Sequence, residues 1–177
     1  MFKKFLILIF AIFLINLPAC ADVFNHPQKL SVIIPQMPEL NSINCKFKQE
    51  KTIPNSTANI KSSGDFRFIK NKGVVFNTTY PLHSTTSYNT TEYRQVNEIV
   101  NAISNKSYSK IERVFNFYFT KNKDEWQLGL IPKKNQQAAK YLASVEIHGK
   151  SYITQMIIKT TNSTKTTIWF SLSLIHI

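Results

Sequence analysis

The side chains best suited to catalysis or metal binding are few in this chain and scattered along it. Its only histidines are His26, His83, His148 and His176. Their spacing does not match that of zinc ligands. Ten acidic residues are present, and no close Asp/Glu pair suggests a general acid and base. Glu50 and Asp65 could meet in space, but we interpret both as solvated residues on strand faces.

Nucleophile motifs are missing as well. No serine lies in a G-x-S-x-G turn, and none of the four glycines belongs to a phosphate-binding loop. Cys45 would be unpaired once Cys20 is removed, and we expect it to be a small, partly buried residue. The sequence therefore predicts no enzyme, with no catalytic residue, metal site or cofactor. A secreted enzyme whose polar groups converge only on folding is the alternative.

The first residues have the organisation of a secretory signal. Lys3 and Lys4 precede an apolar run over 5–17, and Pro18-Ala-Cys-Ala21 precedes the return to polar residues at Asp22. The run has 13 residues, whereas a membrane-spanning helix needs about 20. We therefore expect residues 1–21 to be a cleaved signal peptide and the protein to be exported.

Two processing routes are open at this site. Cleavage after Ala21 would leave Asp22 as the first residue, and we favour it. Leu17-Pro-Ala-Cys20 also resembles a lipobox, which would make Cys20 a lipid-bearing first residue. Pro18 is unusual in that motif.

Residues 22–177 have a length suited to one domain. The whole chain has a formal charge of +12, and loss of Lys3 and Lys4 would lower it by two. Such a charge could attract acidic lipid surfaces or nucleic acid. We favour the alternative that it is spread over solvated faces, because no dense Lys/Arg run occurs. We expect no nucleic-acid partner, since an exported protein has little access to nucleic acid.

The first half of the chain has the alternation of β-strands. A lead segment over 22–43 contains a short helix or turn near 27–34. From 44 onward, apolar and charged residues alternate. Residues 59–79 are predicted to form a hairpin with Phe66 and Phe68 on one face and Asp65 and Arg67 on the other. A short strand pair is expected over 82–93.

A helical period interrupts this pattern. Val96, Ile99, Val100 and Ile103 fall on one face of a predicted helix over 95–105. Strands are expected to resume at Glu112 and to continue to Pro132. A short helical piece is predicted over 134–141, followed by strands near 143–148, 151–160 and 165–173.

The predicted strands place large apolar residues on one face. Two interpretations are open: an ordinary core, or a half-closed barrel with an apolar cavity that holds lipid beneath the 95–105 helix as a lid. Burial of acyl chains is worth about 0.8 kcal/mol per CH₂, so such a cavity needs no catalytic group. The candidate lining residues are Phe47, Phe66, Phe68, Phe76, Phe115, Phe117, Trp126 and Leu128.

Five short sequence motifs, which include several of these residues, occur in a recognisable order along the chain. They are Cys45-Lys-Phe-Lys-Gln49, Ile60-Lys-Ser-Ser-Gly-Asp-Phe66, Gly73-Val-Val-Phe76 with Tyr80-Pro81, Glu125-Trp-Gln-Leu-Gly-Leu-Ile-Pro132, and Val145-Glu-Ile-His-Gly149. Over roughly 22–170 they resemble the LolA family of periplasmic outer-membrane lipoprotein carriers.

The resemblance implies a mainly β fold with helices, namely an unclosed antiparallel β-barrel with a helical lid over an apolar cavity. It also implies a monomeric periplasmic carrier that takes acylated lipoproteins from an inner-membrane transporter to an outer-membrane receptor. A related lipid or glycolipid could replace the lipoprotein. If Cys20 is lipidated, the chain would instead resemble LolB, the membrane-anchored acceptor.

Two regions depart from the family pattern. The family has an arginine–proline pair where this chain has Lys70 and Asn71, and that arginine helps to hold the lid shut. Lysine keeps the charge but not the planar fork, so Lys70 is only a candidate lid contact. The end of the chain, 172–177, is either a natural final strand or the non-native tail of a truncated reading frame.

Overall fold

The structure is a computed structural model that describes residues 22–39, 42–69, 73–87, 99, 101–102 and 108–172. Within these ranges, no helix combines the length and the apolar character that crossing a membrane requires. The predicted signal peptide over 1–21 lies outside the described residues, as do Lys70, Asn71 and the chain end beyond 172.

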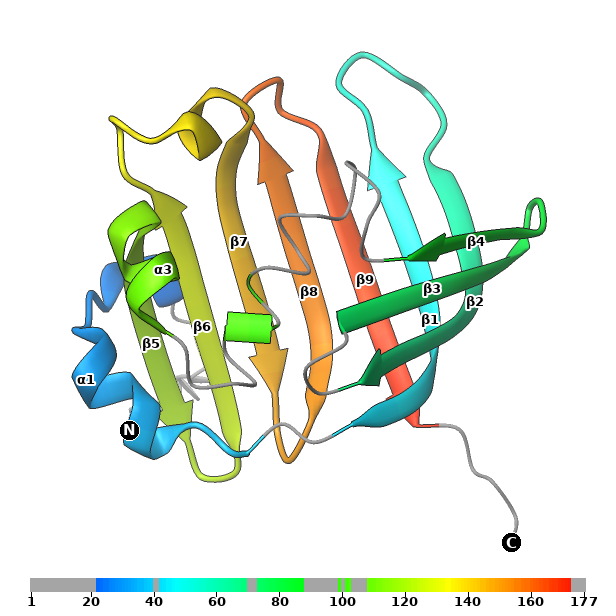
Figure 1. Cartoon of the computed structure of the whole chain (residues 1–177). Helices are drawn as coiled ribbons and strands as arrows, with labels where there is room; N and C mark the ends of the chain where they lie inside the picture. The colour runs from blue at the N-terminus through cyan, green and yellow to red at the C-terminus, as the bar shows by residue number, and fades with distance from the viewer. Residues whose placement is uncertain are drawn as a thin grey trace, which may run out of the picture.

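Most of the described chain belongs to one antiparallel sheet of nine strands in the order β4-β3-β2-β1-β9-β8-β7-β6-β5. The two end strands, β4 and β5, do not pair with each other, so the sheet is unclosed, and it curls around one concave side (Figure 1). The strands are β1 (Ile43–Thr52), β2 (Ile60–Ile69), β3 (Gly73–Tyr80), β4 (Ser84–Ser87), β5 (Phe115–Asn122), β6 (Glu125–Pro132), β7 (Leu142–Gly149), β8 (Ile153–Thr160) and β9 (Lys165–Leu172).

The pairing register aligns the apolar residues of neighbouring strands on the concave side. Phe47 of β1 lies opposite Phe170 of β9, and Met156 of β8 lies between Ile168 and Ile147. Since successive side chains in a strand point to opposite faces, the intervening charged residues point to the convex side. The sequence alternation thus becomes one continuous apolar surface over many strands.

Short helical segments pack on this concave surface. They are α1 (Leu30–Ile33), followed by the 3₁₀ turn η2 (Ile34–Gln36), and α3 (Tyr108–Val114). Figure 1 shows α3 in front of β5 and β6. Ile99 and Ala102 are also helical, and both are buried in the same core. A further 3₁₀ turn, η3 (Gln137–Lys140), lies in the connection between β6 and β7.

The N-terminal segment crosses the free edge of β5. The 3₁₀ turn η1 (Val23–Asn25) packs on the convex side, where a Cβ added to Gly129 would lie 2.8 Å from a ring carbon of Phe24. The amides of Gln28 and Phe119 then donate hydrogen bonds to the carbonyls of Phe117 and His26, both at 3.0 Å. The chain continues to α1 on the concave side, so residues 22–36 form a strap around this edge.

The strand expected to resume at Glu112 is the main error of the sequence prediction. Residues 108–114 form α3, and β5 begins only at Phe115. Tyr108 and Ile111 are buried and Val114 is half-buried. Their spacing of three residues is the helical signal, and it was missed because the strong alternation of the following phenylalanines extended the strand assignment backwards.

Other predicted elements agree closely with the structure. The hairpin over 59–79 is confirmed as the antiparallel pair β2–β3, and α1 and η2 occupy the predicted turn near 27–34. The helical piece over 134–141 is the shorter η3. Of the strand pair expected over 82–93, β4 forms the first strand, and 88–93 lie outside the described residues.

Candidate ligand-binding face

All eight candidate lining residues lie in one hydrophobic core on the concave side, and each is less than a tenth exposed. They come from five strands: Phe47 from β1, two from β2, one from β3, two from β5 and two from β6. We call the concave side chains of the sheet the aromatic face. Its members predicted from the sequence are Phe47, Phe66, Phe68, Phe76, Phe115, Phe117, Trp126 and Leu128.

One end of the aromatic face is a cluster of four phenylalanines. The ring of Phe76 lies 5.1 Å from that of Phe47 and 5.0 Å from that of Phe66, both edge-to-face. Phe170 packs against Phe66 at 4.7 Å between centroids. Edge-to-face contacts at these distances are favourable because the positive ring edge meets the negative ring face. The cluster joins β3, β2, β1 and β9 across the curled end of the sheet.

The other end of the aromatic face is built around Trp126. Its indole N–H donates a hydrogen bond of 2.6 Å to the carbonyl of Lys150. The ring lies over Gly149, where an added Cβ would be 2.2 Å from a ring carbon. Gly149, directly opposite Trp126 in the register, therefore leaves the space that the indole ring occupies against β7.

Three separate segments cover the aromatic face in this conformation. They contribute Leu30 and Ile33 from α1, Ile99 and Ala102 from the predicted lid helix, and Tyr108 and Ile111 from α3. Ile99 is only 2 % exposed. The other predicted lid residues, Val96, Val100 and Ile103, lie outside the described residues.

Burial favours the neutral forms of two titratable side chains in the core of the aromatic face, Cys45 and Tyr108. Burial, with a smaller contribution from the negative charge of Asp65, raises the pKa of the Cys45 thiol to about 11. Burial also raises the pKa of Tyr108. Among the described residues, no group of three His, Cys, Asp or Glu side chains is placed to hold a metal ion. The face thus offers apolar contact and almost no polar chemistry.

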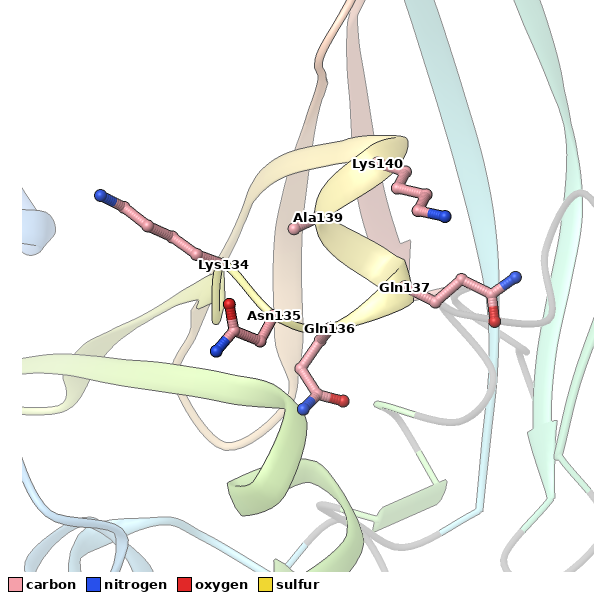
Figure 2. A pocket seen from close by; sticks show the side chains of 6 residues that line it. All are labelled: Lys134, Asn135, Gln136, Gln137, Ala139 and Lys140. Carbon is pink, nitrogen blue, oxygen red and sulfur yellow. The ribbon is translucent and has the colours of Figure 1, made fainter.

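A separate pocket of about 390 Å³ lies at the β6–β7 connection (Figure 2). Lys134, Lys140 and three amide side chains line it. Figure 2 shows these side chains extending away from one another rather than toward a common point. The pocket is a hollow on the surface of this connection, and we assign it no ligand.

Several members of the aromatic face were absent from the sequence prediction. Phe119, Met156, Ile168 and Phe170 are all buried there. Phe119 follows the alternation of Phe115 and Phe117 in β5 and shares their face. Ile168 and Phe170 belong to a strand that the sequence predicts, but their position beside β1 could not be inferred, because the pairing of β9 with β1 joins segments more than a hundred residues apart.

No protein-family model matches this chain, and no curated protein matches it significantly.

Proposed function

We propose that this protein is a periplasmic carrier that binds acyl chains of lipoproteins, or of another lipid, against its aromatic face. The observation that carries the proposal is the extent of that face: one apolar surface runs through the concave side of an unclosed sheet and is covered by short, separate segments.

The chemistry of the face suits an acyl chain. A lipid tail requires apolar surface without specific hydrogen bonds, and its transfer from water is favoured by about 0.8 kcal/mol for each CH₂ group. Phenylalanine rings and the long side chains of Leu128 and Met156 provide such a surface. An acyl chain of about a dozen methylene groups would contribute about 10 kcal/mol, which is of the order of the burial lost when the covering side chains leave the face.

The segments that cover the aromatic face should separate from it at a low cost in free energy. The helix α1 has four residues and α3 has seven, and helices this short are marginal without tertiary contacts. Segments with few buried contacts open at a lower free energy than a sheet core. In the proposed cycle, α1, α3 and the helix around Ile99 separate from the sheet when a lipid enters.

The resemblance of the motifs to LolA carriers supplies the direction of transport in this proposal. An inner-membrane release transporter would deliver the acylated cargo, and an outer-membrane receptor would accept it. The unclosed curled sheet with helices on its concave side (Figure 1) supports the resemblance on which this proposal rests.

A photoreactive lipid tests the proposal without destabilising the protein. The full chain is mixed with a triacylated lipopeptide that bears a diazirine in one acyl chain, irradiated, and mapped by mass spectrometry. We expect saturable labelling of Phe115 and Trp126. Each has a neighbour in the same strand that points to the convex side, Asn116 and Gln127, which serves as an internal control.

Labelling of Asn116 and Gln127 equal to that of Phe115 and Trp126, or labelling that does not saturate, would contradict binding at the aromatic face. If a photoreactive fatty acid labels the protein saturably and the lipopeptide does not, the cargo is a lipid other than a lipoprotein.

A second candidate rests on the Leu17-Pro-Ala-Cys20 sequence. If Cys20 carries lipid, the same domain would be a membrane-anchored acceptor that resembles LolB. The intact mass of the mature protein distinguishes the two: an unmodified Asp22 at the N-terminus excludes the anchored form.

A further inference from the structure

The convex side of four central strands carries an excess of positive charge. In β2, β1, β9 and β8 the outward positions are those between the buried residues of the aromatic face. We call these outward side chains the cationic face. Its described charged members are six basic residues and two acidic residues: Lys46, Lys48, Lys61, Arg67, Lys159, Lys165, Glu50 and Asp65.

The charges on this face are only partly neutralised within the protein. Asp65 forms an ion pair with Lys46 at 2.5 Å, and Glu50 accepts a hydrogen bond from Asn59. Over the described part of the chain, Lys48, Lys61, Lys159 and Lys165 form no ion pair. The pairing of β8 with β9 even sets Lys159 directly opposite Lys165, and like charges so placed are destabilising. The stability of the fold therefore does not explain the face.

An exposed tryptophan lies at the centre of the cationic face. Trp169 of β9 is 42 % exposed and pairs with Lys48 of β1 on one side and Gln155 of β8 on the other. Burying an indole is favourable, so leaving it on a solvated strand face sacrifices stabilisation. Tryptophan and lysine together are suited to a membrane interface. The indole lies at the boundary between headgroups and acyl chains, and the lysine stem lies along apolar groups while its ammonium group stays in water.

From this combination we propose that the cationic face binds the surface of an anionic lipid bilayer, with Trp169 at the headgroup boundary. The positive excess complements anionic headgroups. Five of the six basic residues are lysines, which are depleted in protein–protein interfaces where arginine is enriched. Four adjacent strands span about 15 Å, so the charges are spread over a broad convex surface rather than gathered into a pocket.

Membrane docking in this orientation is independent of the carrier role. The cationic face and the aromatic face are opposite sides of the same strands, because their residues alternate. A protein bound through its convex side would keep α1, α3 and the aromatic face directed away from the bilayer.

Tryptophan fluorescence provides a direct test. The chain has two tryptophans, Trp169 and the buried Trp126, which is 1 % exposed. A Trp169→Phe variant retains Trp126 alone and so reports any signal that lipid at the aromatic face produces. The full chain is titrated with vesicles of phosphatidylcholine containing 30 % phosphatidylglycerol. We expect a shift of emission to shorter wavelength that pure phosphatidylcholine vesicles do not cause and that high salt reverses.

Charge variants locate the contact. Each lysine near an anionic membrane contributes about fivefold to the partition coefficient, so Lys48→Gln with Lys165→Gln should lower it about 25-fold. The matched control is Lys110→Gln in α3 with Lys123→Gln in the β5–β6 turn, at the other end of the sheet. It should change the partition coefficient less than about twofold because charges beyond a Debye length are screened. All variants keep the same N-terminus as the parent chain, so any contribution of residues 1–21 cancels.

Three results would overturn the proposal. Vesicle binding that is equal in both double variants would assign the contact to another part of the chain. An emission shift with soluble polyglutamate but none with vesicles would assign the face to an acidic protein partner. A shift that depends on protein concentration, together with dimers in sedimentation, would assign it to a second copy of the chain.

Discussion

The reactivity of the Cys45 thiol depends on whether the aromatic face is covered, because the side chain is buried there. Its thiol is 3 % exposed in β1, beside Phe66 in the register. Because the thiolate is the reactive form, the raised pKa and the burial act in the same direction. The residue is suited to packing, as the sequence predicted, and not to nucleophilic chemistry.

We therefore expect slow alkylation of Cys45 in the folded protein. Raising the pKa from 9.0 to about 11 lowers the thiolate fraction at pH 8 roughly 100-fold. Iodoacetamide labelling of the Cys45 peptide should be slower by at least that factor than in urea. Since the folded pKa lies above the ordinary value, the thiol's contribution to stability is present below pH 9 and is lost as the pH rises toward 11. Equal labelling rates with and without urea would show that β1 is open.

Gly149 should be intolerant of a side chain because of Trp126. A Cβ there would lie 2.2 Å from the indole and 2.7 Å from the carbonyl of Tyr152. We expect Gly149→Ala to lower the free energy of unfolding by about 1–3 kcal/mol, measured by urea denaturation. Ser171→Ala, at an exposed position of β9, is the control and should change it by less than about 0.5 kcal/mol. A neutral Gly149→Ala would mean that the indole is free to move.

At the scale of elements, the strap around the edge of β5 links the two sides of the sheet. Residues of η1 pack on the convex side, and α1 packs on the concave side. Lys121 of β5 also donates a hydrogen bond of 3.2 Å to the carbonyl of Gln36. The strap therefore protects a free strand edge and anchors one part of the cover.

Adjacent residues of α1 provide a matched test of this role. Ile33 is 1 % exposed, whereas Val32 is 47 % exposed. Ile33→Ala should destabilise the protein by about 2–4 kcal/mol through the cavity it leaves, and Val32→Ala by less than about 0.5 kcal/mol. Urea denaturation of both variants gives the comparison. Equal effects would show that α1 does not pack on the aromatic face in solution.

At the scale of the whole molecule, one core connects both ends of the sheet. It runs from Phe76 on β3 through Ile168 on β9 to Phe117 on β5. No described strand belongs to a second sheet. Cooperative unfolding of the sheet follows from this continuity.

Hydrogen exchange in increasing urea should show this cooperativity. Amides of β2 and of β6 are expected to lose protection at the same urea concentration, whereas those of α1 and α3 should exchange earlier because few buried contacts hold them. Loss of β2 protection well before that of β6 would show that the curled end of the sheet unfolds independently.

Local patterns in the sequence determined a large part of this fold. Alternation placed Phe66 and Phe68 on one face of a strand, and turn residues separated β2 from β3, because both signals depend on neighbours in the chain. The eight lining residues could be chosen for the same reason. The helix α3 was missed since its three-residue period is short and borders a stronger alternating pattern.

Only the tertiary structure decided which of these faces meet. The pairing of β9 with β1 brings Phe170 to Phe66 and also sets Trp169 beside Lys48. The position of Trp126 over Gly149, and of Leu30 and Ile33 on the aromatic face, likewise depends on contacts between distant segments. Side-chain periodicity is a local property, whereas strand order and the packing of covering helices result from long-range burial of apolar surface.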